Sequence, residues 1–147
     1  SMGYATAAAI GGKLAAPSRP VIAVAGDGCF LMNGMEVQTA VSHNIPVVWI
    51  VQNNARLGLV HELQKFSLGE KTVSTSFREV NIAKVAGGLG AQSFRISRPG
   101  ELARVLPQAL ASGKPTVFDV IVDPNEVPPI HRWAKGVSEL NARLDYL

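Results

Sequence analysis

The sequence has 147 residues, of which 47% are hydrophobic and 17% are charged, and its net charge is +3. This length and composition fit one globular domain and exclude a disordered chain. The lysines and arginines are dispersed and no stretch of about 18 apolar residues occurs, so we expect neither a nucleic-acid partner nor a membrane span. Cys29 is the only cysteine, which excludes an intrachain disulfide and fits a cytoplasmic protein.

The first half of the chain alternates helical and strand-like segments. Residues 4–16 are rich in alanine and predict a helix. Residues 21–26 (VIAVAG) form a short apolar run that predicts a strand covered on both faces. Residues 33–44 have apolar side chains at helical spacing, and residues 45–51 (IPVVWIV) predict a second buried strand.

The second half continues this alternation after a long irregular segment, residues 52–77, which we expect to be a functional loop. The remaining predicted elements are a helix over 78–90, a strand over 92–97, a helix over 98–114 and a strand over 115–123. Strands that alternate with helices favour an α/β fold, here an open, doubly wound parallel sheet with helices on both faces. Residues 1–147 are then expected to form one domain.

The end of the first strand carries an unusual carboxylate, Asp27, between Gly26 and Gly28. Parallel sheets bind ligands at the carboxyl ends of their strands, and glycines allow a close approach to the backbone. A helix that begins just beyond would favour a phosphate, but Asp27 would repel it. A divalent cation between the carboxylate and the phosphate resolves this conflict, as Mg²⁺ commonly does.

The second strand also ends in polar residues, Gln52, Asn53 and Asn54. If the two strands are neighbours, their tips meet, and an asparagine amide oxygen would complete the shell of a Mg²⁺ ion without adding charge. The residues therefore predict a metal–phosphate site. The alternatives are a turn role for Asp27 and a turn or helix-cap role for the asparagines.

These two motifs carry a resemblance to a known family. The GDG at 26–28, followed at this distance by the NN at 53–54, resembles the thiamine diphosphate motif. The flanking sequences SMGYATAAAIGGKLAAP, NNARLGLVHELQ and SRPGELARVLPQALASGKPTVFDVIVD resemble acetolactate synthase-like enzymes. The resemblance covers nearly the whole chain. It implies a thiamine diphosphate-binding fold, with residues 1–147 as the C-terminal, diphosphate-binding domain and a fragment of a longer three-domain enzyme.

The resemblance also implies a ligand set. Mg²⁺ would be bound by Asp27, by the side chain of Asn54 and by the backbone carbonyl of Arg56. The residues implied to contact thiamine diphosphate are Gly26, Asp27, Gly28, Cys29, Asn54, Arg56, Leu57, Gly58 and Leu59. No catalytic residue is expected in this chain, because the activating glutamate of the family belongs to the N-terminal, pyrimidine-binding domain of a partner subunit.

The implied function is half of the active site of an enzyme that decarboxylates or carboligates a 2-oxo acid, as a homodimer or homotetramer, with the isolated domain inactive. Glu62 and Leu63 stand where synthases of the family tend to carry Gln-Trp, so a benzoylformate decarboxylase-like lyase or another 2-oxo acid decarboxylase stays open. A catalytically silent assembly domain is the non-enzymatic alternative. A dinucleotide-binding domain is disfavoured, because GDGCFL lacks a third glycine and the second strand ends in QNN.

Overall fold

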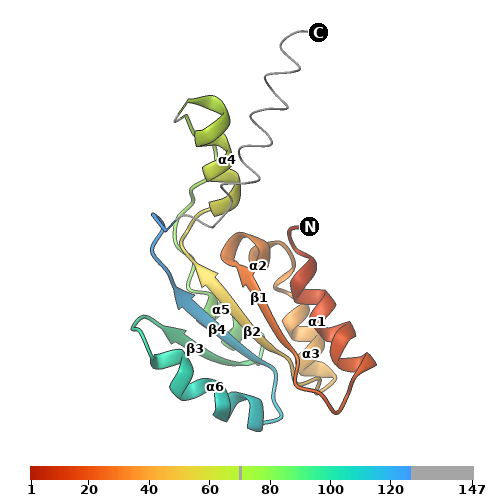
Figure 1. Cartoon of the computed structure of the whole chain (residues 1–147). Helices are drawn as coiled ribbons and strands as arrows, with labels where there is room; N and C mark the ends of the chain where they lie inside the picture. Colours follow the sequence, from red (N-terminus) through yellow and green to blue (C-terminus); the bar gives the residue numbers. More distant parts are fainter. Residues whose placement is uncertain (70, 127–147) are drawn as a thin grey trace.

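The computed structural model describes residues 1–69 and 71–126 (Figure 1). The tail from residue 127 onwards lies outside the described residues. The elements, in chain order, are α1 (Tyr4–Ala15), β1 (Ile22–Gly26), α2 (Asp27–Asn33), α3 (Glu36–Ser42), β2 (Val48–Asn53), α4 (Gly58–Leu68), α5 (Ile82–Gly88), β3 (Gln92–Ile96), α6 (Glu101–Ala111) and β4 (Thr116–Ile121).

The four strands form one parallel sheet in the order β1-β2-β4-β3. In register, Gly26 of β1 lies opposite Gln52 of β2, and Asn53 of β2 lies opposite Ile121 of β4. All four strands therefore end at the same edge of the sheet, which confirms the predicted parallel α/β fold. No helix among the described residues is long and apolar enough to cross a membrane.

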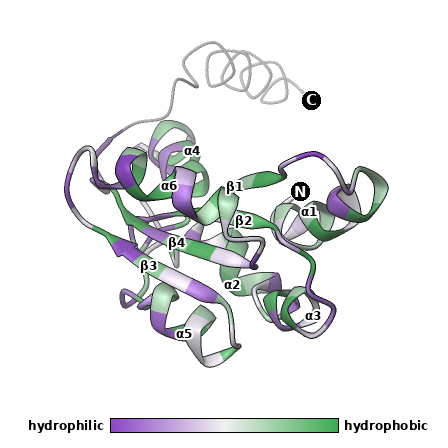
Figure 2. Ribbon diagram, turned by 90° about the horizontal axis from the view of Figure 1, so that it is seen from below, coloured by the Kyte–Doolittle hydropathy of each residue, from purple (hydrophilic) through white to green (hydrophobic). Residues whose placement is uncertain are grey.

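Helices cover both faces of the sheet because the strand side chains alternate. In β2, Trp49 and Val51 point into the core on one face, while Val48 packs in the core on the other. Figure 2 shows α1, α3 and α5 on the first face and α6 on the second. The first core contains Ile10, Phe30, Val37, Ala40, Trp49, Val51, Ile82, Ala86 and Val117, and the second contains Val48, Ile96, Ala109 and Phe118.

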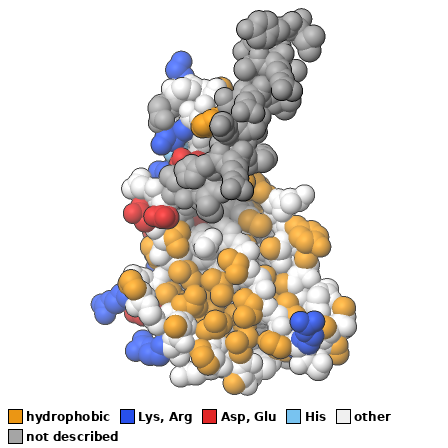
Figure 3. Space-filling view, in the orientation of Figure 1, with side chains coloured by type: hydrophobic (Ala, Val, Ile, Leu, Met, Phe, Trp, Pro, Cys, Tyr) orange, Lys and Arg blue, Asp and Glu red, His pale blue; other side chains and the backbone are white. Residues whose placement is uncertain are grey.

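The second face is only partly covered. Helix α6 packs over β4, whereas the β1 side chains on this side, Ile22 and Val24, are 43% and 58% exposed. Figure 3 shows hydrophobic side chains gathered on the same face of the molecule. The described chain therefore leaves an apolar area of sheet in contact with solvent.

Two predicted segments differ from the structure. The helix expected over 33–44 is present as the shorter helix α3, and a separate helix that was not predicted, α2, precedes it and begins at Asp27, directly after β1. Gly34 ends α2 beneath the ring of Phe30, which turns the chain before α3 starts at Glu36. The carboxylate of interest is thus the first residue of a helix rather than part of a loop.

The segment 52–77, expected to be irregular, contains the eleven-residue helix α4. Figure 1 shows α4 projecting beyond the carboxyl edge of the sheet. None of its residues is buried. A helix without a buried face does not need apolar residues at regular helical spacing, and the sequence therefore did not predict it. Helix α5 starts later than expected, at Ile82, because the side chain of Asn81 caps it by accepting a hydrogen bond from the Lys84 N–H at 2.8 Å.

Candidate functional site

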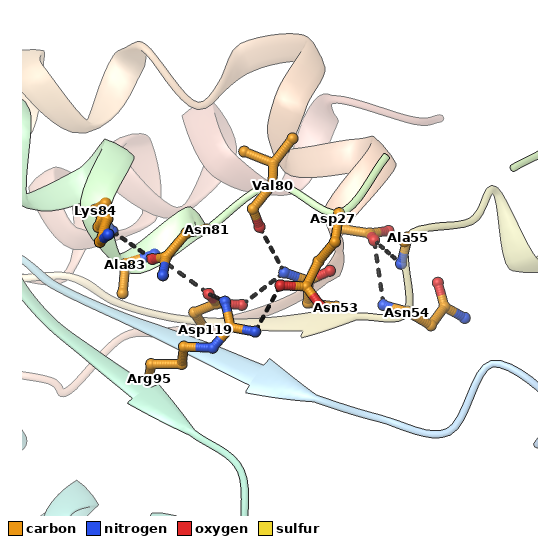
Figure 4. Close-up of polar contacts among 11 residues, drawn as sticks. Asp27, Asn53, Asn54, Ala55, Val80, Asn81, Ala83, Lys84, Arg95 and Asp119 are labelled. Atoms are coloured by element: carbon orange, nitrogen blue, oxygen red, sulfur yellow. Dashed lines mark hydrogen bonds and ion pairs between the residues drawn. The ribbon is translucent and has the colours of Figure 1, made fainter. Parts of the chain in front are cut away.

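The tips of β1 and β2 meet at the carboxyl edge of the sheet. Because Gly26 pairs with Gln52, the residues that follow each strand lie side by side, as the two motifs predicted. Asp27 is the first residue of α2 and is only 2% exposed. Figure 4 shows its carboxylate pointing toward the backbone of Asn54 and Ala55.

The Asp27 carboxylate is held by backbone N–H groups from both strand tips. Its Oδ1 accepts a hydrogen bond from Gly28 at 2.7 Å, and its Oδ2 accepts from Asn54 at 3.1 Å and from Ala55 at 2.6 Å. Ala55 has a positive φ of 54°, which turns the chain so that consecutive N–H groups face the carboxylate. Within the described residues Asp27 has no ion-pair partner, so its negative charge is not neutralised by a side chain.

The electrostatics of this carboxyl group favour a cation. Burial raises the pKa of Asp27 above its ordinary value of 3.8, and the hydrogen bonds from Gly28, Ala55 and Asn54 oppose that rise. A cation placed against the carboxylate would stabilise its charged form, because opposite charges attract strongly where water is excluded. The buried, unpaired carboxylate is thus suited to a metal ion.

Asn54 carries a second candidate oxygen ligand in its side chain. Its backbone N–H is bound to the carboxylate, while its side chain is partly exposed and makes no hydrogen bond within the described part of the chain. The side chain lies against the start of α4, since a Cβ added at Gly58 would stand 3.3 Å from the Asn54 amide nitrogen. The amide oxygen is therefore available to a ligand.

Arg56 follows in a short antiparallel bridge with Ser76. The two hydrogen bonds of this bridge come from neighbouring groups: the Leu57 N–H donates to Thr75, and the Phe77 N–H donates to the Ala55 carbonyl. The bridge uses neither the N–H nor the carbonyl of Arg56 itself. Its carbonyl oxygen is therefore free to serve as a third ligand, and it is neutral like the Asn54 amide.

The other predicted cofactor-contacting residues lie around this point. An added Cβ at Gly28 would meet the end of the Leu57 side chain, which would have to move, so Gly28 and Leu57 lie directly against each other. Leu57 is the N-cap of α4, and Gly58 and Leu59 form its first turn. Cys29 differs, because its Sγ accepts a hydrogen bond from the Gly3 N–H at 3.1 Å and so faces the N-terminal segment.

The donor set fits a hard cation. No group of three or more His, Cys, Asp or Glu side chains that could hold a metal occurs among residues 1–69 and 71–126. One carboxylate, one amide oxygen and one carbonyl oxygen make instead the sparse oxygen set with which Mg²⁺ binds when phosphate supplies further ligands. The residues present therefore fit a Mg²⁺–diphosphate group.

Asp119 was missed by sequence reasoning. This residue of β4 is fully buried and accepts a hydrogen bond from the Asn53 side chain at 2.8 Å. A carboxylate inside the apolar run 115–123 was the available signal, since buried charges need specific partners. Asn53, the first residue of the NN pair, points into the protein and is no candidate metal ligand.

Comparisons with known proteins assign the chain to a family. The model of the C-terminal TPP-binding domain of thiamine pyrophosphate enzymes matches residues 1–120; thiamine pyrophosphate (TPP) is another name for thiamine diphosphate. The chain belongs to this family of cofactor-binding domains.

The relatives are longer enzymes. The chain is 36% identical over 131 residues to a probable acetolactate synthase large subunit of Methanocaldococcus jannaschii, covering 88% of this chain and 22% of the relative. It is 37% identical over 125 residues to acetolactate synthase of Bacillus subtilis, covering 84% and 21%. Among solved structures, a thiamine diphosphate-dependent 4-hydroxybenzoylformate decarboxylase of Rhodococcus jostii matches with a TM-score of 0.75 and 25% identity, covering 83% of this chain and 23% of that one. The chain thus spans about a fifth to a quarter of these proteins.

Proposed function

We propose that this domain binds the diphosphate of thiamine diphosphate through a Mg²⁺ ion held by Asp27, the Asn54 side chain and the Arg56 carbonyl. The observation that carries the proposal is the buried Asp27 carboxylate, which has no ion-pair partner in the described chain and is hydrogen-bonded to Asn54 at 3.1 Å. A buried carboxylate without an ion-pair partner favours a cation, and the neighbouring oxygens suit Mg²⁺.

The domain forms half of an active site in this proposal. When bound, thiamine diphosphate supplies the carbanion-stabilising group for chemistry on 2-oxo acids. This chain contributes the ligands that hold the cation, the backbone around Gly28 and the first turn of α4. The activating glutamate comes from the pyrimidine-binding domain of a partner subunit in a homodimer or homotetramer, so the domain alone has no catalytic turnover.

The reaction is proposed to be decarboxylation or carboligation of a 2-oxo acid, as in acetolactate synthases. A lyase is the second candidate, favoured by the similarity to the 4-hydroxybenzoylformate decarboxylase and by Glu62 and Leu63 at the positions where synthases tend to carry Gln-Trp. A catalytically silent assembly domain would lack Mg²⁺-dependent cofactor binding, and this separates it from both enzymatic candidates.

Calorimetric and NMR titrations of the chain with thiamine diphosphate, in Mg²⁺ and then in excess chelator, test the proposal. Binding should need Mg²⁺ and should shift the backbone amide signals of Gly28 and Asn54. Asp27→Asn should weaken binding at least about 100-fold, or ~2.7 kcal/mol, since it removes the only charged ligand that the proposed protein set provides. Binding of NAD in place of thiamine diphosphate would overturn the proposal. Equal affinity for thiamine diphosphate with and without the chelator would also overturn it.

Two exposed residues of α3 provide matched controls. Glu36→Gln makes the same change from carboxylate to amide as Asp27→Asn, and Gln38→Ala removes an amide as Asn54→Ala does. Both control variants should bind Mg²⁺ and thiamine diphosphate as the unchanged chain does. If the controls lose as much affinity as Asp27→Asn and Asn54→Ala, the assigned ligands are wrong.

A further inference from the structure

The end of β2 lies in a buried polar cluster that the proposed ligands do not explain. Asn53 is 2% exposed and Asp119 is fully buried. The Asn53 amide nitrogen donates to Asp119 Oδ1 at 2.8 Å and to the Val80 carbonyl at 2.9 Å (Figure 4). One side chain thus ties the tip of β2 to β4 and to the segment that precedes α5.

Asp119 extends this cluster to two further elements. Its Oδ2 accepts hydrogen bonds from the Ala83 N–H in the first turn of α5, at 3.4 Å, and from Arg95 of β3, at 3.2 Å. Arg95 in turn pairs with Glu79 at 2.6 Å. The Asp119 charge is therefore balanced and hydrogen-bonded, as a buried carboxylate must be, and the cluster forms a fixed frame behind the sheet edge.

The metal loop, residues 54–56, is held by this frame at both ends. On one side it continues directly from Asn53. On the other side it is joined to residues 75–77, through Leu57 to Thr75 at 2.7 Å and Phe77 to Ala55 at 3.1 Å. Residues 75–77 lead within three positions to Val80, which the Asn53 side chain binds. Movement of the Asn53 amide would therefore disturb both supports of the loop.

The orientation of the Asn53 amide is unambiguous. Its nitrogen faces two acceptors, so a flipped amide would set its oxygen against the Val80 carbonyl and the Asp119 carboxylate. Its Oδ1 is buried without a hydrogen-bond partner in the described chain. An apolar residue would avoid that unsatisfied atom, so the amide is explained by the two acceptors that it holds.

We propose that Asn53 and Asp119 are positioning residues that hold the loop 54–56 in the geometry needed to bind the cation. This inference rests on the proposed Mg²⁺-dependent function. According to this inference, Asn53, the first asparagine of the NN pair, does not contact the metal. Asn53 instead fixes the backbone from which Asn54 and Arg56 reach the Mg²⁺ ion. Partners that orient metal ligands typically change metal affinity by 10- to 100-fold when they are removed.

The test measures Mg²⁺ affinity at a fixed thiamine diphosphate concentration for the whole chain and its variants. Asn53→Ala and Asp119→Asn should each raise the apparent Mg²⁺ Kd about tenfold or more, with cofactor binding recovered at high Mg²⁺. Backbone hydrogen exchange at Asn54 and Ala55, whose N–H groups bind Asp27, should accelerate in both variants. Unchanged Mg²⁺ affinity in folded variants would overturn the inference.

Thr116→Val is the control for a merely structural role. Thr116 is a fully buried polar residue of the same strand, β4, but it lies at the opposite edge, where its hydroxyl is within hydrogen-bond distance of Gln92 Oε1 at 3.2 Å and of the Lys114 carbonyl at 3.0 Å. This variant should lose stability while Mg²⁺ affinity and exchange at Ala55 stay unchanged. An equal loss of Mg²⁺ affinity in Thr116→Val would mean that the affinity follows global stability alone.

A measurement on the unchanged chain tests the positioning role of Asn53 even if the variants do not fold. If the Asn53 amide positions the loop, cation binding must stabilise that amide in return, because coupling between sites is reciprocal. Exchange of the Asn53 side-chain amide protons should then slow several-fold when Mg²⁺ and thiamine diphosphate bind. No change in this exchange on saturation would refute the inference, whereas absence of Mg²⁺-dependent binding would refute the proposed function instead.

Discussion

The paired strand tips and helix α4 differ in how much of the surrounding chain holds them. At the tips, Asp27 and Asn53 are almost fully buried and are bound by groups from neighbouring elements. In α4 no residue is buried, and Leu59, Phe66 and Leu68 are each about half exposed. The difference indicates that the strand tips, where we propose that the cation binds, are held in place by the fold, whereas α4 has no packing partner of comparable extent within the described chain.

The largest effect is expected in the core beneath the tips. Trp49 of β2 is 1% exposed and its indole N–H donates to the Thr6 carbonyl at 3.2 Å. Trp49→Ala should lower the free energy of unfolding by about 3–5 kcal/mol, because it leaves a large cavity and removes a buried hydrogen bond. Urea unfolding measures this loss. A loss below about 1 kcal/mol would contradict the view that the tips rest on a rigid core.

The next effect concerns the helix that carries Asp27. A Cβ at Gly34 would stand 2.7 Å from the Phe30 carbonyl oxygen and 2.6 Å from its ring. Gly34→Ala should therefore cost about 1–3 kcal/mol through overpacking, measured by thermal or urea unfolding.

Gly11→Ala in α1 is the matched control for this substitution. Nothing lies within 4 Å of a Cβ at Gly11, so alanine there should stabilise the helix by about 0.5–1 kcal/mol. If both variants change the free energy of unfolding by the same amount and in the same direction, the close contact at Gly34 does not affect stability.

A smaller effect is expected in α4. Phe66→Ala removes a large side chain that is half exposed and should change the free energy of unfolding by less than about 0.5 kcal/mol. The same unfolding experiment as for Trp49 gives the comparison directly. A cost of several kcal/mol would mean that α4 is anchored in the isolated chain, and the contrast between the two regions would fail.

The smallest effect is a pH dependence remote from both regions. Hydrogen bonds from the backbone N–H groups of Ser97 and Arg98 hold the pKa of Glu101 below its ordinary value of 4.5. This stabilisation is fully present above the ordinary value and is lost as the pH falls through the lower, folded-state value. Thermal unfolding from neutral pH to about pH 3 should show a shallower decline for Glu101→Gln than for the unchanged chain. Identical pH profiles for the two proteins would show that the Glu101 hydrogen bonds do not stabilise the fold.

The meeting of Asp27 and Asn54 was predictable because it depends on local order in the sequence. Each residue directly follows an apolar strand, one helical crossover separates the two strands, and such strands are commonly neighbours. The structure pairs them as β1 and β2. The start of α2 at Asp27 was not predicted, because the glycines around that residue gave a stronger signal for a turn than for a helix.

The network around Asp119 could not be assembled from the sequence. Its partners Asn53, Ala83 and Arg95 lie 66, 36 and 24 positions away along the chain. They meet only because the strand order β1-β2-β4-β3 places the last strand in the middle of the sheet. That order follows from packing of the whole domain, which no local pattern encodes.

Strand β1, the edge strand with Ile22 and Val24 exposed, has a practical consequence. It carries no lysine and no proline within Ile22–Gly26, and these are residues that commonly protect a sheet edge from pairing with another molecule. An open apolar edge of this kind promotes intermolecular β-pairing and aggregation as the protein concentration rises. Solutions of this chain should therefore be kept dilute and checked by light scattering before any titration is interpreted.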